Sequence, residues 1–446
     1  MQRLVSPISL LVSLFAVGWS WSVQADDWPQ WLGKNRDGVY AESGVIDAIP
    51  EAGLNVRWRV PVGPGYSGPA VVGNRVFLSD YVRESGTPFN EPGKRATLNG
   101  QERIHCLDAK TGESLWQHAY DCPYSISYPN GPRCTPTVDG DRVYSLGSEG
   151  DLICLNAQDG TVVWQRSFKN DFAAKVPLWG FSGHPLVEGE LLICMVGGPG
   201  QTVVAFDKLT GEVRWKGLDA SAVGYCPPSI VEAGGTRQLI VWHADAIVSL
   251  NPNDGSPYWT VPIKPSYEMA VTRPQVDGNQ MYASGIHSES VLLQLATDRP
   301  AATELWRGQR NQAVYCCNST PLFFDGNIFG ADCNVGALVA VDAKTGKRHW
   351  QSFAPTKPDE TRFIKHGTAF LTRLGASDRC LLFSETGDLI VAALTADGYE
   401  EHGRFHVVDP TAEAFGRKVV WSHPAYAQQT AFIRNDKELV AVDLAK

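Results

Sequence analysis

The chain has 446 residues, a formal net charge of −9 and ten cysteines. This acidic balance argues against a nucleic-acid partner and against adhesion to anionic lipid, because both carry negative charge. A chain of this length can bury a large core without disulfides to hold it. The cysteines form no CxxC or CxxCH pair, which argues against zinc-ribbon, thioredoxin-like and c-type haem proteins.

Residues 1–25 have the pattern of a secretory signal peptide. Arg3 precedes the apolar run "LVSPISLLVSLFAVGW", and Val23 and Ala25 suit the small-residue positions of a signal-peptidase site. A membrane anchor is the alternative, but Pro7 and the abrupt polar end of the run favour cleavage. No later segment is apolar for long enough to span a bilayer. We therefore expect a soluble, exported protein, periplasmic or extracellular, in a compartment where disulfides persist.

A segment that ends in tryptophan repeats along the chain, as in "LICLNAQDGTVVW" and "LVAVDAKTGKRHW". The period is about 47 residues, which is typical of stacked supersecondary units. Five copies are well preserved, and one, "LLQLATDRPAATELW", is degenerate. The copies end at Trp116, Trp164, Trp215, Trp259, Trp306 and Trp350.

Each repeat carries the signals of four short strands. An alternating segment opened by proline and closed by a glycine turn comes first, and two strands joined by an Asp-x-x-Thr-Gly turn follow. The Asp or Asn accepts backbone N–H bonds and the Gly supplies a positive φ, while the Trp can pack on the neighbouring unit. Four strands per unit predict the blade of a β-propeller. The residues expected to dock the blades are Asp108, Gly112, Trp116, Gly160, Trp164, Asp207, Gly211, Trp215, Gly255, Trp259, Asp342, Gly346 and Trp350.

The repeats predict eight blades. Six end at the tryptophans above, a seventh is expected to run to "GRKVVW" at Trp421 with an insertion around residues 395–415, and the last lacks its outer strand. Residues 54–61 are expected to supply that strand, which closes the ring and removes an exposed sheet edge. The prediction is an all-β, eight-bladed propeller of four-stranded antiparallel blades at residues 54–446, after an extended lead-in at residues 26–53.

The blade motif resembles the repeat of the pyrroloquinoline quinone (PQQ) enzymes over essentially all of residues 28–446, and "DWPQWLGKNRDGV" resembles the lead-in of quinoprotein dehydrogenases. Relatives of this kind include PQQ-dependent dehydrogenases and the outer-membrane assembly factor BamB. BamB keeps the propeller without cofactor or catalysis, so the resemblance is compatible with a non-catalytic protein as well as with an enzyme. Because the repeated residues hold blades together, the resemblance indicates the scaffold and leaves the activity open.

The channel mouth on the face opposite the Asp-x-x-Thr-Gly turns is the expected binding site. Long insertions at residues 82–102, 117–133 and 351–365 lie on this face, and variable loops on a rigid scaffold are where ligands tend to bind. The aromatic and basic side chains there favour a planar or anionic ligand, although large side chains would also fill a wide channel. The candidate ligand-binding residues are Tyr66, Arg133, Trp179, Phe181, His184, Tyr225, Arg273, Tyr315, Cys316, Cys317 and His423.

Cys316 and Cys317 are adjacent, and the pair resembles the vicinal disulfide beside the quinone of PQQ alcohol dehydrogenases, although that pair occurs earlier in the ring. Adjacent cysteines close only a strained ring. Cys333 is expected on the same face and offers an unstrained partner. A vicinal bridge, a bridge from either cysteine to Cys333, and free thiols are the three alternatives. In a scaffold with no cofactor to cap, the bridge to Cys333 is favoured.

A PQQ dehydrogenase also needs calcium, held by oxygen ligands, and a carboxylate base. Glu268 is the candidate base and, with Asn318, the candidate calcium ligand, while Asp121 is a second carboxylate in a long loop. No GxSxG, HExxH or GxxxxGK[ST] motif occurs. The leading interpretation is a monomeric, non-catalytic binding or assembly scaffold for a protein partner or small ligand. The alternatives are a PQQ- and calcium-dependent alcohol or sugar dehydrogenase and a carbohydrate-binding propeller.

Overall fold

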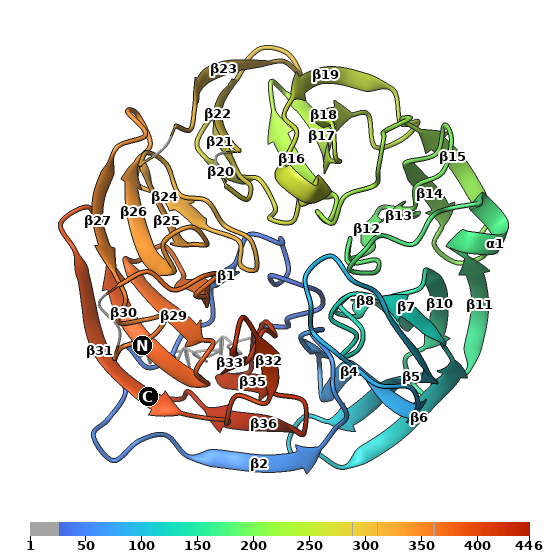
Figure 1. The fold of residues 1–446 in the computed structure, drawn as a ribbon, viewed down its shortest axis with the longest axis horizontal. Helices are drawn as coiled ribbons and strands as arrows, with labels where there is room; N and C mark the ends of the chain where they lie inside the picture. The colour runs from blue at the N-terminus through green and yellow to red at the C-terminus, as the bar shows by residue number, and fades with distance from the viewer. Residues whose placement is uncertain (1–25, 288, 310, 360–361) are drawn as a thin grey trace, which may run out of the picture.

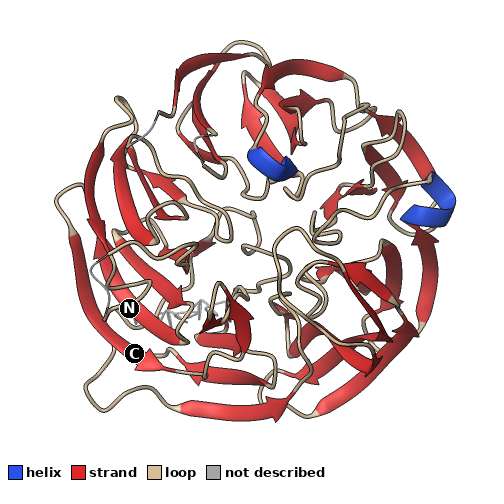
Figure 2. Ribbon diagram, viewed as in Figure 1, coloured by secondary structure: helices blue, strands red, loops and turns tan. Residues whose placement is uncertain are grey.

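In the computed structural model, which describes residues 26–446 except 288, 310, 360 and 361, eight four-stranded antiparallel sheets surround a central channel (Figure 1). The described part is almost entirely strand, with one short helix, α1 (Phe168–Phe172), and one 3-10 turn, η1 (Ser266–Glu268) (Figure 2). The eight-bladed propeller predicted from the repeats is confirmed.

Each blade begins with its innermost strand. Blade 1 consists of β3 (Ala70–Val72), β4 (Arg75–Ser85), β5 (Ala96–Asp108) and β6 (Ser114–Asp121), and blade 2 of β8 (Thr137–Asp139), β9 (Arg142–Leu146), β10 (Asp151–Asn156) and β11 (Val162–Ser167). Blade 3 consists of β12 (Leu186–Glu188), β13 (Leu191–Met195), β14 (Val203–Asp207) and β15 (Val213–Gly217), and blade 4 of β16 (Ser229–Ala233), β17 (Thr236–Trp242), β18 (Ala246–Leu250) and β19 (Pro257–Pro262).

Blade 5 consists of β20 (Gln275–Asp277), β21 (Gln280–Ser284), β22 (Ser290–Leu295) and β23 (Ala302–Arg307), and blade 6 of β24 (Leu322–Phe324), β25 (Asn327–Asp332), β26 (Ala337–Asp342) and β27 (Arg348–Ser352). Blade 7 consists of β28 (Ala369–Leu374), β29 (Arg379–Ser384), β30 (Asp388–Leu394) and β31 (Tyr399–His406). Blade 8 takes β34 (Ala425–Ala427), β35 (Thr430–Arg434) and β36 (Glu438–Asp443) from the C-terminus and β2 (Val56–Pro61) from the N-terminal part. The short strands outside the blades are β1 (Val39–Tyr40), β7 (Tyr124–Ile126), β32 (Ala412–Ala414) and β33 (Arg417–Val419).

The ring closes through blade 8. β2 pairs antiparallel with β36, from Val56 opposite Val442 to Pro61 opposite Glu438. Figure 1 shows β2, in blue, along the outer side of the red β36. Because both chain ends contribute to one sheet, the edge that β36 would otherwise expose is covered.

Neighbouring blades are joined by the repeated Trp and Gly. The indole N–H of Trp164 donates to the carbonyl of Lys208 in the next blade at 3.1 Å. Gly211, at φ +70°, lies so close to this indole that a Cβ there would be 2.6 Å from Trp164. The glycine therefore supplies both the turn conformation and the space for the tryptophan. The same indole-to-carbonyl bond joins Trp58 to Ala109, Trp116 to Ala157, Trp215 to Pro252, Trp306 to Ala343 and Trp350 to Thr395.

Two of the junctions that have a tryptophan differ from this pattern. Trp259 donates to Gln238 Oε1 within its own blade, at 2.8 Å, instead of to the next blade. Trp306, which ends the degenerate repeat, packs more loosely, since a Cβ on Gly346 would lie 3.5 Å from its indole. The aspartates of the repeated turns make the same hydrogen bonds. Asp108, Asp207 and Asp342 each accept a bond from a backbone N–H two or three residues later in the chain.

The predicted end of the seventh blade was wrong. Its outer strand is β31, which follows β30 after a tight turn in which Thr395 N donates to Gly398 O at 3.1 Å. The outer strand β31 contains no tryptophan, so the usual Trp marker is missing from this blade. Trp421 instead follows the separate hairpin of β32 and β33 at the channel mouth.

Residues 26–40 of the lead-in pass along the inner strands of the channel, whereas Ile46 and Ile49 lie farther out, where their N–H groups donate to Leu444 and to His402 of the outer strand β31. Trp28 forms a two-way backbone bridge to Val71 of β3, and β1 then pairs in parallel with β28 of blade 7. Between these points the fully buried Arg36 donates to the carbonyls of His184 and Pro228, each at 3.0 Å. Figure 1 shows this blue segment near the centre of the ring. The lead-in therefore links blades that are remote from one another around the channel.

Candidate functional site

A cavity of about 420 Å³ opens at the channel mouth, opposite the face of the Asp-x-x-Thr-Gly turns. We refer to it as the mouth cavity. Its volume falls within the range of small-ligand pockets. Loops that lead into the inner strands form its walls, and the lead-in contributes Trp31 to its floor. The aromatic rings that line it are Trp31, Tyr66, Tyr128, Trp179, Tyr225, Tyr267, Phe415 and Trp421.

The structure brings most of the sequence-predicted ligand residues together here. The ones that line the mouth cavity are Tyr66, Arg133, Trp179, His184, Tyr225, Cys317 and His423, together with the predicted calcium ligand Asn318. Four lie outside its lining. Phe181 packs edge-to-face on Phe168, while Arg273, Tyr315 and Cys316 are buried among the inner strands.

The two candidate catalytic carboxylates lie outside the lining as well. Glu268 is on the 3-10 turn η1 and is exposed, although its neighbours Tyr267 and Met269 line the mouth cavity. Asp121 ends the outer strand β6, where it accepts a hydrogen bond from Gln101 Nε2 at 2.9 Å. Sequence reasoning placed Asp121 in a loop, but β5 and β6 continue as a long pair that carries it away from the channel.

Several cavity residues escaped the sequence analysis. Trp31 comes from the lead-in, Lys365 and His366 from the insertion before β28, and Phe415 and Trp421 from the hairpin of β32 and β33. None of them stands beside an inner-strand proline, the one positional signal used. Only the folding of these insertions over the channel mouth brings them to the mouth cavity.

The floor of the mouth cavity is a stack of uncharged rings. Trp31 stacks on His184 at 4.8 Å between ring centres, nearly parallel, and meets His423 edge-on at 5.6 Å. Burial lowers the pKa of His423 to about 3. Burial, with further contributions from Arg36 and His423, lowers the pKa of His184 well below its usual value. Both imidazoles are therefore neutral at physiological pH.

The charges of the mouth cavity are positive. The Arg133 guanidinium lies over the ring of Tyr66 at 5.1 Å, and its Nη2 donates to the carbonyls of Ser127 at 3.0 Å and Tyr128 at 2.6 Å. Lys365 lies 4.9 Å from the ring centre of Phe415. Among the described residues, none that lines the mouth cavity is Asp or Glu. The protein thus presents a cationic, aromatic cavity although its overall charge is −9.

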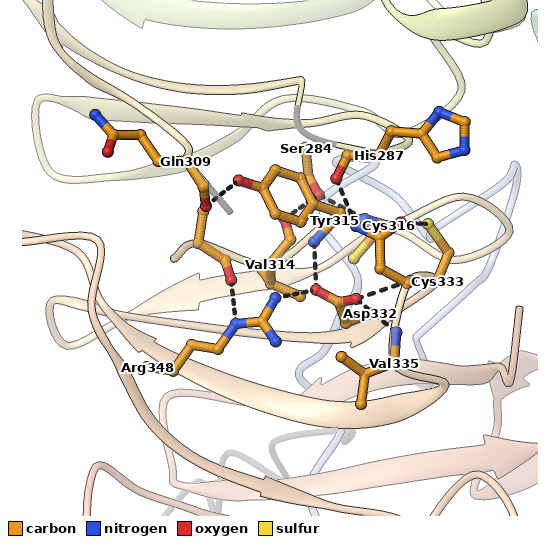
Figure 3. A network of polar contacts seen from close by, with 12 residues as sticks. Ser284, His287, Gln309, Val314, Tyr315, Cys316, Asp332, Cys333, Val335 and Arg348 are labelled. Carbon is orange, nitrogen blue, oxygen red and sulfur yellow. Dashed lines mark hydrogen bonds and ion pairs between the residues drawn. The ribbon is translucent and has the colours of Figure 1, made fainter. Parts of the chain in front are cut away.

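The "VYCC" segment is fixed by a polar network around Asp332 (Figure 3). Asp332 Oδ2 accepts the N–H of Tyr315 at 3.1 Å and forms an ion pair with Arg348 at 2.5 Å. The N–H of Cys316 donates to Ser284 Oγ at 2.8 Å, and that of Cys333 to the carbonyl of Tyr315 at 2.7 Å. These bonds set the backbone so that Cys317 reaches the cavity wall.

All ten cysteines are among the described residues, and each is buried and carries a free thiol. The vicinal bridge and the favoured bridge to Cys333 are therefore both absent from this structure, which has the third arrangement considered, free thiols. Cys317 and Cys333 nevertheless belong to one apolar cluster, while Cys316 packs in another, against Gly330.

The residues present do not fit a calcium–PQQ site. Calcium takes six to eight oxygen ligands, most of them carboxylate or carbonyl. The mouth cavity offers the side chain of Asn318 but no carboxylate, and Glu268 is directed to solvent. No group of three or more His, Cys, Asp or Glu within the described ranges is placed to hold a metal ion. A carboxylate base next to a bound alcohol is missing from the lining for the same reason.

A family model described as outer membrane protein assembly factor BamB matches residues 100–352 and residues 228–446. The chain belongs to this PQQ-repeat family. The resemblance expected from the blade motif is thereby confirmed, and it holds for most of the propeller.

Relatives of both kinds match the chain. Polyvinylalcohol dehydrogenase from Sphingopyxis sp. (strain 113P3) is 22% identical over 85% of this chain and 65% of its own length. Outer membrane protein assembly factor BamB from Burkholderia pseudomallei (strain K96243) is 21% identical over 71% of this chain and 74% of its own length. The match to the first of these relatives thus leaves about a third of that enzyme without a counterpart here.

Solved structures share the fold at low identity. BamB from Moraxella catarrhalis superposes with a TM-score of 0.56 at 15% identity, covering 87% of this chain and 97% of that one. A europium-containing methanol dehydrogenase gives a TM-score of 0.60 at 12% identity, covering 94% and 89%. Because the same scaffold carries an assembly factor and a dehydrogenase, the fold alone does not choose between them.

Proposed function

We propose that this protein is a binding and assembly scaffold without dehydrogenase chemistry, and that the mouth cavity is its ligand site. The observation that carries the proposal is the composition of the cavity: aromatic walls and two cations, with no carboxylate in the described lining. Aromatic rings favour a planar ligand, and Arg133 and Lys365 favour a negative charge on it. A planar ring that carries a carboxylate combines both properties, as part of a small molecule or of a protein partner.

The binding test compares naphthalene-2-carboxylate with the uncharged naphthalene-2-carboxamide, followed by the fluorescence of the tryptophans in the mouth cavity. We expect the carboxylate to bind more tightly than the amide. A hydrogen bond to a charged group contributes about 1.5–3 kcal/mol, so Arg133→Gln should weaken carboxylate binding about tenfold or more. Arg299→Gln is the matched control, because Arg299 is an exposed arginine paired with Asp298 outside the cavity lining. Equal affinity for acid and amide would contradict the proposed charge preference.

The dehydrogenase alternative draws its support from the relatives and from Cys317 in the cavity wall. It is tested by adding PQQ and calcium to the purified protein and measuring alcohol-dependent or sugar-dependent dye reduction. We expect no dye reduction above the rate without protein. Turnover that requires both additions would overturn the scaffold proposal, whichever ligands the mouth cavity also binds.

The carbohydrate alternative is less well matched to the mouth cavity. A sugar brings several hydroxyl donors, which need acceptors, and Asn318 carries the only amide or carboxylate oxygen among the lining side chains. Tight binding of neutral oligosaccharides, with the naphthalene pair inactive, would favour this alternative over ours.

Export to the periplasm or beyond, as a soluble monomer, is part of the proposal. The pattern of residues 1–25 supports it, and these residues lie outside the described part of the chain. No helix in the described ranges is long and apolar enough to cross a membrane. N-terminal sequencing of the exported protein and its mass in solution test the leader and the monomer directly.

A further inference from the structure

The hairpin that leads from blade 7 to blade 8 folds over the channel mouth and supplies two rings to the mouth cavity (Figure 1). We call it the mouth hairpin. It consists of β32, the two-residue turn of Phe415 and Gly416, and β33. The ring centres of Phe415 and Trp421, which both line the cavity, are 6.2 Å apart. In the described part of the chain the mouth hairpin pairs with no strand of a blade, so other contacts must hold it in place.

The backbone of this turn is unusual for the residue that it carries. Phe415 and Gly416 have φ of +50° and +76°, and a hairpin turn with positive φ at both positions favours Asn-Gly or Asp-Gly. The turn between β24 and β25 follows this preference, since Asp325 and Gly326 have φ of +52° and +68°. A bulky residue at positive φ is disfavoured, because its Cβ crowds the following carbonyl oxygen. Phe415 therefore keeps a conformation that Asn or Asp adopts with less strain.

The ring of Phe415 lies among other groups of the mouth cavity. The imidazole of His366 stacks on it at 4.7 Å between ring centres, and the ammonium of Lys365 lies 4.9 Å from its centre. Both neighbours line the cavity as well. Burial, with further contributions from nearby positive charges, lowers the pKa of His366 to about 4, so its ring is uncharged at physiological pH. Strained residues cluster at ligand clamps and active sites, where a side chain must hold one position.

A buried carboxylate anchors the mouth hairpin to blade 7. Glu385, in the turn between β29 and β30, is buried and lies outside the cavity lining. Its side chain accepts two hydrogen bonds from the Arg417 guanidinium, at 2.8 and 3.1 Å, and one from the indole N–H of Trp421 at 3.0 Å. Its carbonyl accepts the N–H of Val420 at 2.8 Å. One residue thus fixes both the hairpin and an indole of the cavity wall.

We propose that Phe415 contacts the ring of the ligand from the strained turn of the mouth hairpin, and that Glu385 is the positioning residue that holds this hairpin. The inference rests on the proposed function, because it assigns roles within the same cavity. Arg133, in the loop before β8, supplies the preference for a charge, whereas the mouth hairpin supplies the preference for a ring. The two preferences come from different parts of the structure, so experiments can separate them.

The main test is Phe415→Asn, compared with the wild type in thermal unfolding and in binding of naphthalene-2-carboxylate and naphthalene-2-carboxamide. We expect both compounds to bind about three- to tenfold more weakly, because an aromatic contact is lost while the cations remain. The ratio of the two affinities should stay the same, in contrast to Arg133→Gln. The thermal midpoint should be no lower than that of the wild type, because Asn suits the turn. Phe89→Asn, an exposed position of the loop between β4 and β5 outside the cavity lining, should leave binding unchanged.

Glu385→Gln tests the anchor. It removes the charge that faces Arg417, so the mouth hairpin should loosen and both compounds should bind more weakly with their affinity ratio unchanged. Binding is measured well below the thermal midpoint of the variant, so that a loss of stability alone does not change it. Should Glu385→Gln fail to fold, Arg417→Lys gives the same measurement, because a lysine cannot make the paired bonds of the guanidinium.

The outcomes separate this inference from the proposed function. If the wild type prefers the carboxylate but Phe415→Asn binds both compounds equally well as the wild type, or melts at a lower temperature, the role of Phe415 is overturned and the proposed function stands. Unchanged affinities in the folded anchor variant would overturn the role of Glu385 in the same way. If the wild type binds neither compound, the proposed function and this inference both fail.

Discussion

His423 illustrates how burial sets the chemistry of single residues at the cavity floor. Its ring meets Trp31 edge-on, and burial lowers its pKa to about 3. A buried neutral imidazole is a packing group with a hydrogen-bonding edge, which suits a floor under a planar ligand. The same displacement of the pKa makes the folded state sensitive to acid.

We expect the free energy of unfolding to fall as the pH drops from about 6.5 toward 3. The unfolded chain takes up a proton on His423 near its ordinary pKa of about 6.5, whereas the folded chain does so only near 3. Stability from this residue is therefore complete above pH 6.5 and is lost as the pH falls through that window. His423→Gln should reduce the slope between pH 6.5 and 5 by up to about 1.4 kcal/mol per pH unit.

Urea titrations at several pH values measure this slope. His349→Gln serves as the control, because His349 is an exposed histidine on β27 and should leave the slope unchanged. Indistinguishable slopes for wild type and His423→Gln would show that His423 is not held neutral in the folded state.

The three cysteines near the mouth cavity differ in what they can reach. Cys317 and Cys333 share an apolar cluster with Ile286, Ala313 and Tyr315, whereas a Cβ on Gly330 would lie 2.7 Å from the sulfur of Cys316. Under oxidising conditions we expect Cys317 to bridge to Cys333 and Cys316 to stay reduced. Burial raises the pKa of Cys333 to about 12, so the exchange should be slow at neutral pH.

Non-reducing peptide mapping of protein that has been oxidised and purified without a reductant checks this. The expected fragment joins the peptides of Cys317 and Cys333. Recovery of an intact bridge between Cys316 and Cys317, with Cys333 alkylated, would contradict it and would strengthen the dehydrogenase alternative.

At the scale of the element, the junction between blades depends on a glycine in the turn of one blade and a tryptophan at the end of the preceding blade. Gly211 and Gly346 have nearly the same backbone, at φ +70° and +68°. They differ in space, because a Cβ would lie 2.6 Å from Trp164 at the first and 3.5 Å from Trp306 at the second. This pair isolates the packing contribution from the backbone contribution.

Gly211→Ala should destabilise the protein more than Gly346→Ala. Both changes carry a similar penalty for an alanine at positive φ, but only the first forces Trp164 to move. Overpacking of this kind costs about 1–3 kcal/mol, and we expect a difference of that size in the free energy of unfolding. Chemical denaturation of the two variants measures it. Equal losses would show that the backbone conformation alone explains the repeated glycine.

At the scale of the whole molecule, closure of the ring and passage of the lead-in along the channel both use residues 26–61. β2 supplies the outer strand of blade 8, and residues 26–40, which precede it in the chain, lie along the inner strands of the channel. These two roles are adjacent in sequence, so truncations of two lengths can separate them.

A protein that lacks residues 26–61 should aggregate, because it loses β2 and exposes the edge of β36. A protein that lacks only residues 26–53 keeps β2, so we expect it to stay monomeric but to melt at a lower temperature, since the contacts of Arg36 are gone. Light scattering and thermal unfolding distinguish the two. A monomeric longer truncation with unchanged melting would contradict closure by β2.

Much of the fold followed from local patterns. The Asp-x-x-Thr-Gly turn and the closing tryptophan are short-range signals, because the turn bonds of Asp108 and the docking of Trp164 recur in several units at a similar spacing. Where that marker is absent, as in β31, the pattern failed, and the end of blade 7 was placed at Trp421, which follows the hairpin of β32 and β33. The inner-strand prolines likewise located Arg133, His184 and other residues of the mouth cavity.

The sequence by itself therefore determined the number of blades, their closure by β2 and one part of the mouth cavity, because these depend on repeats and on spacing along the chain. Only the tertiary structure decided which side chains meet. Trp31 lies under His184 and Arg36 near Arg273 because the lead-in threads the channel, and Trp421 reaches the mouth because a hairpin folds over it. The absence of a carboxylate from the described cavity lining also depends on the tertiary structure. Glu268 and Asp121 are close in sequence to residues that line the mouth cavity, but Glu268 lies on the turn η1 and Asp121 at the end of the outer strand β6, outside the lining.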